Sequence, residues 1–293
     1  MAMDVMIKQK LFGNKTMPLE VILGDTLHYG SFENDQLNEG VLGEGEFVAY
    51  NPESIGRGFS VVWTPKEKKR IALRLPLPST ERELTDFYAA IARMVRYWDA
   101  KLTVDGEKVS LEHFLNGLSD MIKHNEKSFR PILQQVLDGE LETLTIYGAK
   151  WSLALGKEEA AAFMERPARY AEWLHEKQSM DVYFETPDFY VGDQGILGRY
   201  ILTDGLPALF PYQPSVPFGI TDTSTGKPVE CRTWLVVIGI DGEKAPLCEM
   251  EYDEFLRRIP AHKQSKYDES RFLLAALTAE EIRELASGKC SQP

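Results

Sequence analysis

Two glycines flank an arginine at Gly56-Arg57-Gly58, directly before the apolar run FSVVW. Such glycines can let backbone N–H groups approach a phosphate, as they do in nucleotide-binding loops. The dinucleotide fingerprint, however, requires a third glycine and a following helix, and Val61 and a strand-like run stand there instead. A kinase-type loop would need a lysine on a later strand, where this sequence carries Arg74. We therefore interpret the two glycines as a turn or bulge, and we keep an anion clasp by Arg57, helped by Arg74, as the alternative.

The other residue types that commonly carry chemistry lack the spacing that they need. None of the five histidines forms the i, i+4 pair of a zinc-protease helix, and no nucleophile motif of the G-x-S-x-G type occurs. Glu249, Glu251 and Asp253 would share one face of a strand, where they could bind a divalent cation but more often form a solvated surface. The sequence thus predicts no catalytic residue, no metal and no cofactor.

The most distinctive stretch of the sequence is PYQPSVPF, in which Pro211, Pro214 and Pro217 recur every third residue. This is the period of the polyproline II helix, a conformation that many proteins recognise. Tyr212 and Phe218 accompany these prolines, and large aromatic side chains often anchor interfaces. The alternative is a rigid loop packed on the protein's own surface. Together with Arg199, which precedes it, this stretch is the predicted location of a binding surface.

Helical and strand-like signals follow one another irregularly along the chain. The run FSVVW and residues 70–77 are separated by a polar turn and predict a hairpin. Thr80 and Glu83 form a capping box before an amphipathic helix, and Thr278 and Glu281 form a second one. Most strand-like runs adjoin another such run, so the predicted fold class is α+β, with mostly antiparallel strands and helices packed on the sheets.

Residues 74–104 and 152–184 share the order strand, aromatic-rich helix, strand. Such an order is compatible with an internal repeat of a β-α-β unit. Two similar α+β halves, residues 1–140 and 141–293, are therefore one interpretation of the chain. A single continuous domain is the other.

The three cysteines indicate a reducing compartment, because their number is odd and no CxxC motif occurs. A hairpin is predicted over residues 231–251, with a two-residue turn at Asp241-Gly242. That register places Cys231 and Cys248 at positions that do not face each other, so no disulfide is expected between them. The N-terminus has no apolar segment typical of a signal peptide, and a cytoplasmic location is predicted.

The net charge of −12 determines which partners are expected. The 45 acidic side chains outnumber the 33 basic ones, and 43% of all residues are hydrophobic, enough for a real core. An acidic protein repels nucleic acids and anionic membranes and attracts a basic protein. We therefore expect a basic protein partner, no nucleic acid and no membrane, and the oligomeric state stays open.

Three stretches of the sequence, LHYGSF, IGRGFSVVW and RLPLPSTE, resemble those of a bacterial protein family that is catalogued as a domain of unknown function. The resemblance runs over most of the chain. It implies a bacterial, cytosolic protein, and it carries no catalytic motif that could be transferred to residues of this chain.

Two functions are consistent with these patterns. The first is a non-enzymatic protein-interaction module, similar to an immunity protein, which would neutralise a basic partner through its acidic surface. The second is an enzyme that acts on a small anionic substrate gripped by Arg57, Arg74 or Arg199, with Asp193 as general base. A pocket that joins those arginines to a carboxylate of raised pKa would favour the enzyme, and an acidic face with exposed aromatic side chains would favour the interaction module.

Overall fold

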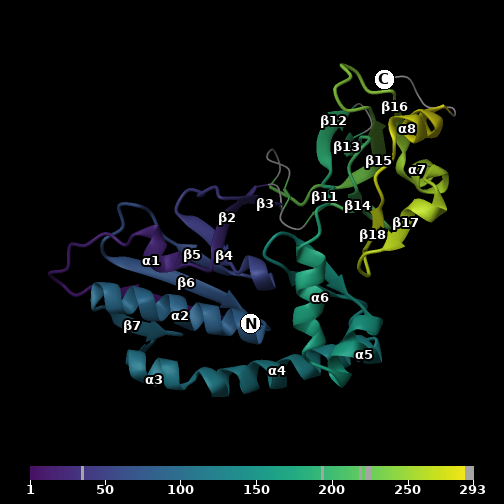
Figure 1. The fold of residues 1–293 in the computed structure, drawn as a ribbon. Helices are drawn as coiled ribbons and strands as arrows, with labels where there is room; N and C mark the ends of the chain where they lie inside the picture. The colour runs from purple at the N-terminus through teal and green to yellow at the C-terminus, as the bar shows by residue number, and fades with distance from the viewer. Residues whose placement is uncertain (34–35, 193–194, 218–219, 222–225, 288–293) are drawn as a thin grey trace. The chain divides into compact units, whose positions relative to one another are not determined.

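The computed structural model describes residues 1–33, 36–192, 195–217, 220–221 and 226–287 (Figure 1). The chain divides into two compact units, which we call the first unit, Met1–Met180, and the second unit, Asp181–Pro293. Helices and mostly antiparallel sheets occur in both units, which confirms the predicted α+β class.

The first unit is built on an antiparallel sheet in the strand order β3-β2-β4-β5-β6-β1-β7-β8. Its strands are β1 (Ala2–Lys8), β2 (His28–Glu33), β3 (Gln36–Glu39), β4 (Glu46–Tyr50), β5 (Phe59–Val62), β6 (Arg70–Pro76), β7 (Lys101–Val104) and β8 (Glu107–Val109). The predicted hairpin is confirmed as β5 and β6, where Val61 faces Leu73. Alternate residues of β6 are buried, because successive side chains of a strand point to opposite faces of the sheet.

Helix α2 (Glu81–Trp98) begins at the predicted capping box, where the Thr80 hydroxyl accepts from the Glu83 N–H and the Glu83 carboxylate accepts from the Thr80 N–H. The helix packs on two sides. Phe87 meets Phe59 of the sheet edge-on, with ring centroids 5.1 Å apart, and Tyr88 stacks on Phe114 at 4.0 Å. Phe114 belongs to α3 (Leu111–Asn116), which follows α2 and the strands β7 and β8 in the chain. The other helices of this part are α1 (Leu19–Leu23), α3 (Leu111–Asn116) and α4 (Leu118–Asp138).

The remainder of the first unit packs on the end of α4. It consists of the hairpin β9 (Leu144–Tyr147) and β10 (Ser152–Leu155) and the helices α5 (Lys157–Glu165) and α6 (Arg169–Gln178). The ring of Phe129 on α4 lies 4.9 Å from that of Tyr170 on α6, and Tyr170 also meets Phe163. Residues 140 and 141, between which the sequence predicts a border as one of two interpretations, both lie in the first unit.

The second unit contains two four-stranded sheets, in the orders β11-β14-β18-β17 and β12-β13-β15-β16. Their strands are β11 (Tyr183–Phe184), β12 (Asp188–Gly192), β13 (Gly195–Leu202), β14 (Ala208–Pro211), β15 (Cys231–Ile238), β16 (Cys248–Glu251), β17 (Gln264–Lys266) and β18 (Arg271–Leu274). Two pairs are parallel, β11 with β14 and β13 with β15. Helices α7 (Tyr252–Arg258) and α8 (Ala279–Ala286) complete one core with both sheets, and α8 begins at the second predicted capping box.

The two segments that share the order strand, helix, strand differ in how their strands pair. Strands β6 and β7 both pair with β1. Strand β10 instead pairs with β9, and β11 pairs with β14 of the second unit. Similar element order therefore accompanies different sheet topology.

The predicted register of the hairpin over residues 231–251 is wrong. Strands β15 and β16 place Ile238 opposite Cys248, so residues 239–247 form the connection instead of a two-residue turn. The proline at position 246 has no N–H for the ladder, which favours a longer loop. Asp241 within that loop donates its N–H to the Asp204 carboxylate at 2.8 Å. Cys231 and Cys248 are not joined by a disulfide.

Candidate functional site

The glycine loop at residues 56–58 closes around a carboxylate of the protein itself. Glu83 of α2 is 5% exposed, and it accepts hydrogen bonds from the N–H groups of Arg57, Gly58 and Thr80. A Cβ atom on Gly56 would come within 2.4 Å of that carboxyl group, so only glycine lets the loop approach it. The N–H groups that a bound phosphate would need already donate to Glu83.

Burial raises the pKa of Glu83, although the three N–H donors and the nearby Arg57 guanidinium act in the opposite direction.

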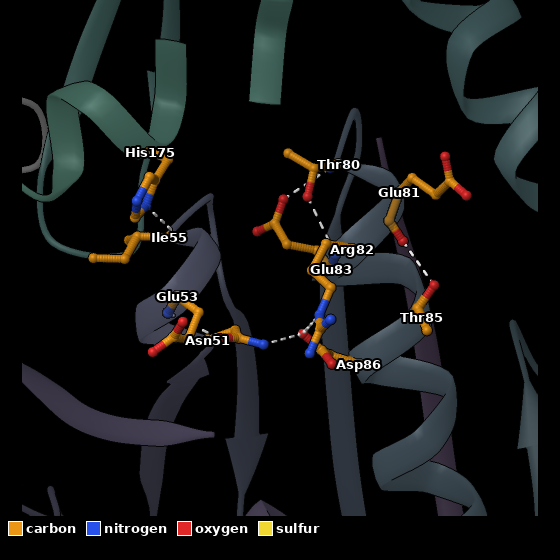
Figure 2. Close-up of polar contacts among 10 residues, drawn as sticks. All are labelled: Asn51, Glu53, Ile55, Thr80, Glu81, Arg82, Glu83, Thr85, Asp86 and His175. Carbon is orange, nitrogen blue, oxygen red and sulfur yellow. Dashed lines mark hydrogen bonds and ion pairs between the residues drawn. The ribbon is translucent and has the colours of Figure 1, made fainter. Parts of the chain in front are cut away.

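The segment that leads into the glycine loop is held by hydrogen bonds at two further points, which Figure 2 shows. The Asn51 amide donates to the Asp86 carboxylate at 2.9 Å, and the Ile55 N–H donates to Nδ1 of His175 at 3.0 Å. This His175 is therefore an acceptor at Nδ1, which fixes the tautomer that holds the loop.

Arg57 and Arg74, the two candidate anion-binding arginines of the first unit, have different partners. The Arg57 side chain donates to the carbonyl oxygens of Tyr147 at 3.1 Å and Pro78 at 3.0 Å. Arg74 lies on β6 and pairs with Asp4 at 3.2 Å, with both side chains more than half exposed. Arg57 thus joins three segments of the first unit, whereas the Arg74 pair is an exposed one of small energetic weight.

Arg199, the third candidate arginine, lies on one face of the sheet β12-β13-β15-β16. Its guanidinium carbon is 4.6 Å from the centre of the Tyr190 ring, and one of its nitrogens is paired with Glu249 across β15. Its Nε atom is buried, and no group in the described part of the chain accepts a hydrogen bond from it. The side chain is 30% exposed and is held on two sides, so it is presented in one orientation.

The residues around Arg199 form a surface that we call the outer face. The strand pairing places on it Tyr190, Leu197, Arg199, Ile201, Leu235, Val237 and Glu249. Their neighbours in the strands, such as Tyr200 and Val236, point the other way into the core. Helices α7 and α8 contribute their apolar residues to that core, on the opposite side of the sheet. Ile201 remains 47% exposed and Tyr190 44% exposed.

The predicted binding residues of the Pro-rich stretch are only partly described. Tyr212 follows β14, is 42% exposed, and packs its ring on Phe272 with centroids 5.5 Å apart. Asp193 and Phe218 lie outside the described residues. Four of the six predicted site residues thus belong to the second unit by sequence, and the structure shows two of them, Arg199 and Tyr212.

A buried carboxylate in the second unit was not foreseen. Glu185 follows β11, is 7% exposed, and its Oε2 atom lies 3.5 Å from the Ile201 N–H. Burial raises the pKa of Glu185 to about 8, and repulsion by Asp188 acts in the same direction. The sequence presents this residue only as the end of a short strand-like run.

Two buried tyrosines, Tyr200 and Tyr252, interact electrostatically with both Glu185 and Arg271. Burial raises the pKa of both Tyr200 and Tyr252, and the Tyr252 hydroxyl donates to the Pro211 carbonyl at 2.6 Å. The Arg271 guanidinium lies 4.5 Å from the centre of the Phe184 ring. These groups come from four separate elements, which is why no local sequence pattern reveals the cluster.

One family model matches the chain: DUF4299, a domain of unknown function, aligns with residues 2–285. The chain is a member of the DUF4299 family. The match spans most of both units and confirms the resemblance of LHYGSF, IGRGFSVVW and RLPLPSTE to a family of that kind. The comparisons with curated proteins and with solved structures gave no match.

Membership of DUF4299 assigns no activity and no ligand, so any function has to be argued from the residues of this chain. Among the helices of the described ranges, none is both long and apolar enough to cross a bilayer. In the same ranges, no group of three or more His, Cys, Asp or Glu side chains is arranged to hold a metal ion. The outer face and the Glu185 region are two features of this DUF4299 protein on which a function can be argued.

Proposed function

We propose that this protein is a protein-interaction module that binds a basic partner through the outer face of its second unit. The observation that carries the proposal is the exposure of Ile201, an apolar side chain in the middle of a sheet face. Leu197, Leu235 and Val237 lie beside it on the same face. Apolar area of this kind, with an aromatic ring and an arginine at its border, is typical of the centre of protein interfaces.

The charges around the outer face support a basic partner. Arg199 is the basic residue of the face, whereas Asp188, Glu249 and Glu251 lie on the same side of the sheet. The second unit as a whole has 18 acidic and 11 basic side chains, so its net charge is −7. Such a field would speed the encounter with a basic protein and would select against acidic ones. A module of this type neutralises its partner by covering it, as an immunity protein does.

The test of the proposal is a lysine placed in the outer face. Ile201→Lys should weaken binding of the basic partner at least about tenfold, because it removes apolar contact and adds a like charge. The partner is first captured from a lysate of the source cells with the wild-type protein, and its affinity is then measured by calorimetry at several salt concentrations.

Val62→Lys is the matched control, because Val62 of β5 is a strand residue of similar exposure, 49%, in the first unit. The proposal requires that Val62→Lys binds as the wild type does. Capture of no basic protein, or equal affinity of Ile201→Lys and wild type, would refute it.

A second candidate function rests on Glu185. A carboxylate with a pKa near 8 can exchange a proton at neutral pH. Arg271, which like Glu185 acts on Tyr200 and Tyr252 and is itself paired with Asp268, is a cation that could hold a small anionic substrate. A screen of anionic metabolites by thermal shift, followed by turnover assays, tests it. If the protein is an enzyme, at least one metabolite should raise its melting temperature and be converted by the wild type but not by Glu185→Gln. If it is an interaction module, no metabolite should be converted.

A further inference from the structure

Leu11 and Phe12 project from the first unit almost completely exposed, at 91% and 95%. They lie in the segment between β1 and α1, which extends away from the sheet at the left of Figure 1. Large apolar side chains this exposed and adjacent are unusual on a protein surface, because they gain nothing from folding.

The segment that carries them is held in place by its own hydrogen bonds. The Gln9 amide donates to the Lys15 carbonyl at 2.8 Å, and its oxygen accepts from the Lys15 N–H at 3.1 Å. Gly13 closes a turn on the Lys10 carbonyl at 2.8 Å. At the far end, Met17 is buried and its carbonyl accepts from the Trp63 indole at 3.0 Å. The pair of apolar side chains is therefore presented outward by a closed loop.

A second loop, between β5 and β6, lies against the first. The Gln9 N–H donates to the Lys69 carbonyl at 3.0 Å, and the Gln9 amide donates to the Lys68 carbonyl at 3.1 Å. Within this loop the Glu67 carboxylate accepts from the N–H groups of Lys68, Lys69 and Arg70. Those hydrogen bonds lower the pKa of Glu67 and occupy its carboxylate with backbone.

The two loops and the strand ends beside them are rich in lysine, although the protein as a whole has a net charge of −12. Exposed cations lie in and beside these two loops, and we call them, together with Leu11 and Phe12, the basic loop surface. Its cations are Lys8, Lys10, Lys15, Lys66, Lys68, Lys69, Arg70 and Lys101, all of them exposed. Among the carboxylates of the same segments, Asp99 is paired with Lys10, and Glu67 accepts from backbone N–H groups.

The sheet register places like charges directly opposite one another on this surface. Lys8 of β1 faces Arg70 on one side and Lys101 on the other. Directly opposed like charges destabilise a sheet, so the arrangement works against folding. An anionic partner would relieve that repulsion.

We propose that the basic loop surface docks on an anionic lipid surface, with Leu11 and Phe12 entering the interface and the lysines contacting the headgroup phosphates. A loop with two almost completely exposed apolar side chains beside exposed cations fits the boundary between headgroups and acyl chains, where both charge and apolar area contribute. An acidic protein or a nucleic acid would use the cations but would have no need of Leu11 and Phe12.

The net charge of −12 is the reason that the sequence predicts no membrane partner, but the net charge of the whole chain does not determine whether one local surface binds a membrane. Charges act on a membrane over about 8 Å at physiological salt, so the local cations count and the distant acids do not.

Sedimentation with lipid vesicles tests the proposal on the full chain. The vesicles are phosphatidylcholine, either pure or with about one third phosphatidylglycerol. We expect binding to the anionic vesicles that weakens as salt increases, and little binding to the neutral ones. Lys68→Gln with Lys69→Gln should lower the partition coefficient about thirtyfold, and Leu11→Ser with Phe12→Ser at least about tenfold.

Tyr147→Ser is the control for the apolar pair, because Tyr147 is an aromatic residue of the same unit that is 57% exposed on β9. It should bind as the wild type does. All variants change exposed residues, and circular dichroism verifies that they are folded.

Insertion itself is tested with Phe12→Trp and brominated lipids. If brominated lipids quench the tryptophan fluorescence of Phe12→Trp more than that of the wild type, residue 12 lies among the acyl chains. The proposal is overturned if the wild type does not bind anionic vesicles at low salt. It is also overturned if binding is unchanged in Leu11→Ser with Phe12→Ser, the result that an acidic protein or nucleic acid partner would predict.

Discussion

Replacing Glu83 with alanine is expected to lower the free energy of unfolding of the first unit by about 4 kcal/mol. The change leaves the N–H groups of Arg57, Gly58 and Thr80 without their acceptor, and each buried donor without a partner costs about 1 to 3 kcal/mol. It also removes the reciprocal half of the capping box that begins α2.

Urea denaturation followed by tryptophan fluorescence measures this change, because Trp63, Trp98, Trp151 and Trp173 all lie in the first unit. Glu81→Ala is the control. Glu81 is an exposed acid in the first turn of the same helix, and its loss should cost well under about 1 kcal/mol. If Glu83→Ala costs no more than Glu81→Ala, the carboxylate does not hold the glycine loop.

Replacing Glu185 with glutamine is expected to stabilise the second unit in alkaline solution by about 5 kcal/mol. The pKa of Glu185 is about 8 in the folded protein and near 4.5 when exposed. Between these values the native state keeps a proton that the unfolded state has released, so stability falls as the pH rises from 4.5 to 8. Above pH 8 the native state holds an ionised, buried carboxylate, and the free energy of unfolding has then lost the full amount that this burial costs.

The measurement is the free energy of unfolding at pH values from about 5 to 9 for wild type and variant. Hydrogen exchange of peptides from β13 and β15, corrected for intrinsic rates, assigns the effect to the second unit. Near pH 5 the two proteins should be equally stable within about 1 kcal/mol, since a protonated carboxyl and an amide are similar in size and polarity.

Glu251→Gln is the matched control for Glu185→Gln, because Glu251 is an exposed acid at the end of β16 in the same unit. Its stability profile should follow that of the wild type. A Glu185→Gln profile that declines with pH as steeply as the wild type would show that Glu185 is not the group that titrates.

Much of the local structure could be predicted because its causes are local. The capping boxes at Thr80 and Thr278 set the starts of α2 and α8, and the proline at position 167 separates α5 from α6. The α+β class followed from strand-like runs that adjoin one another. The hairpin register over residues 231–251 failed, because a turn signal at Asp241-Gly242 can also occur inside a longer loop.

The amino-acid sequence alone determined the net charge, the fold class, the ends of several helices and the family resemblance, since each depends on residues close together in the chain or on their sum. Only the tertiary structure decided that Glu83 occupies the N–H groups of the glycine loop and that Glu185 is buried beside Ile201. It also decided that two separate lysine-bearing loops lie against each other, joined by hydrogen bonds from Gln9. The physical reason is that burial and local potential depend on which distant segments meet, and neither pattern nor composition records that.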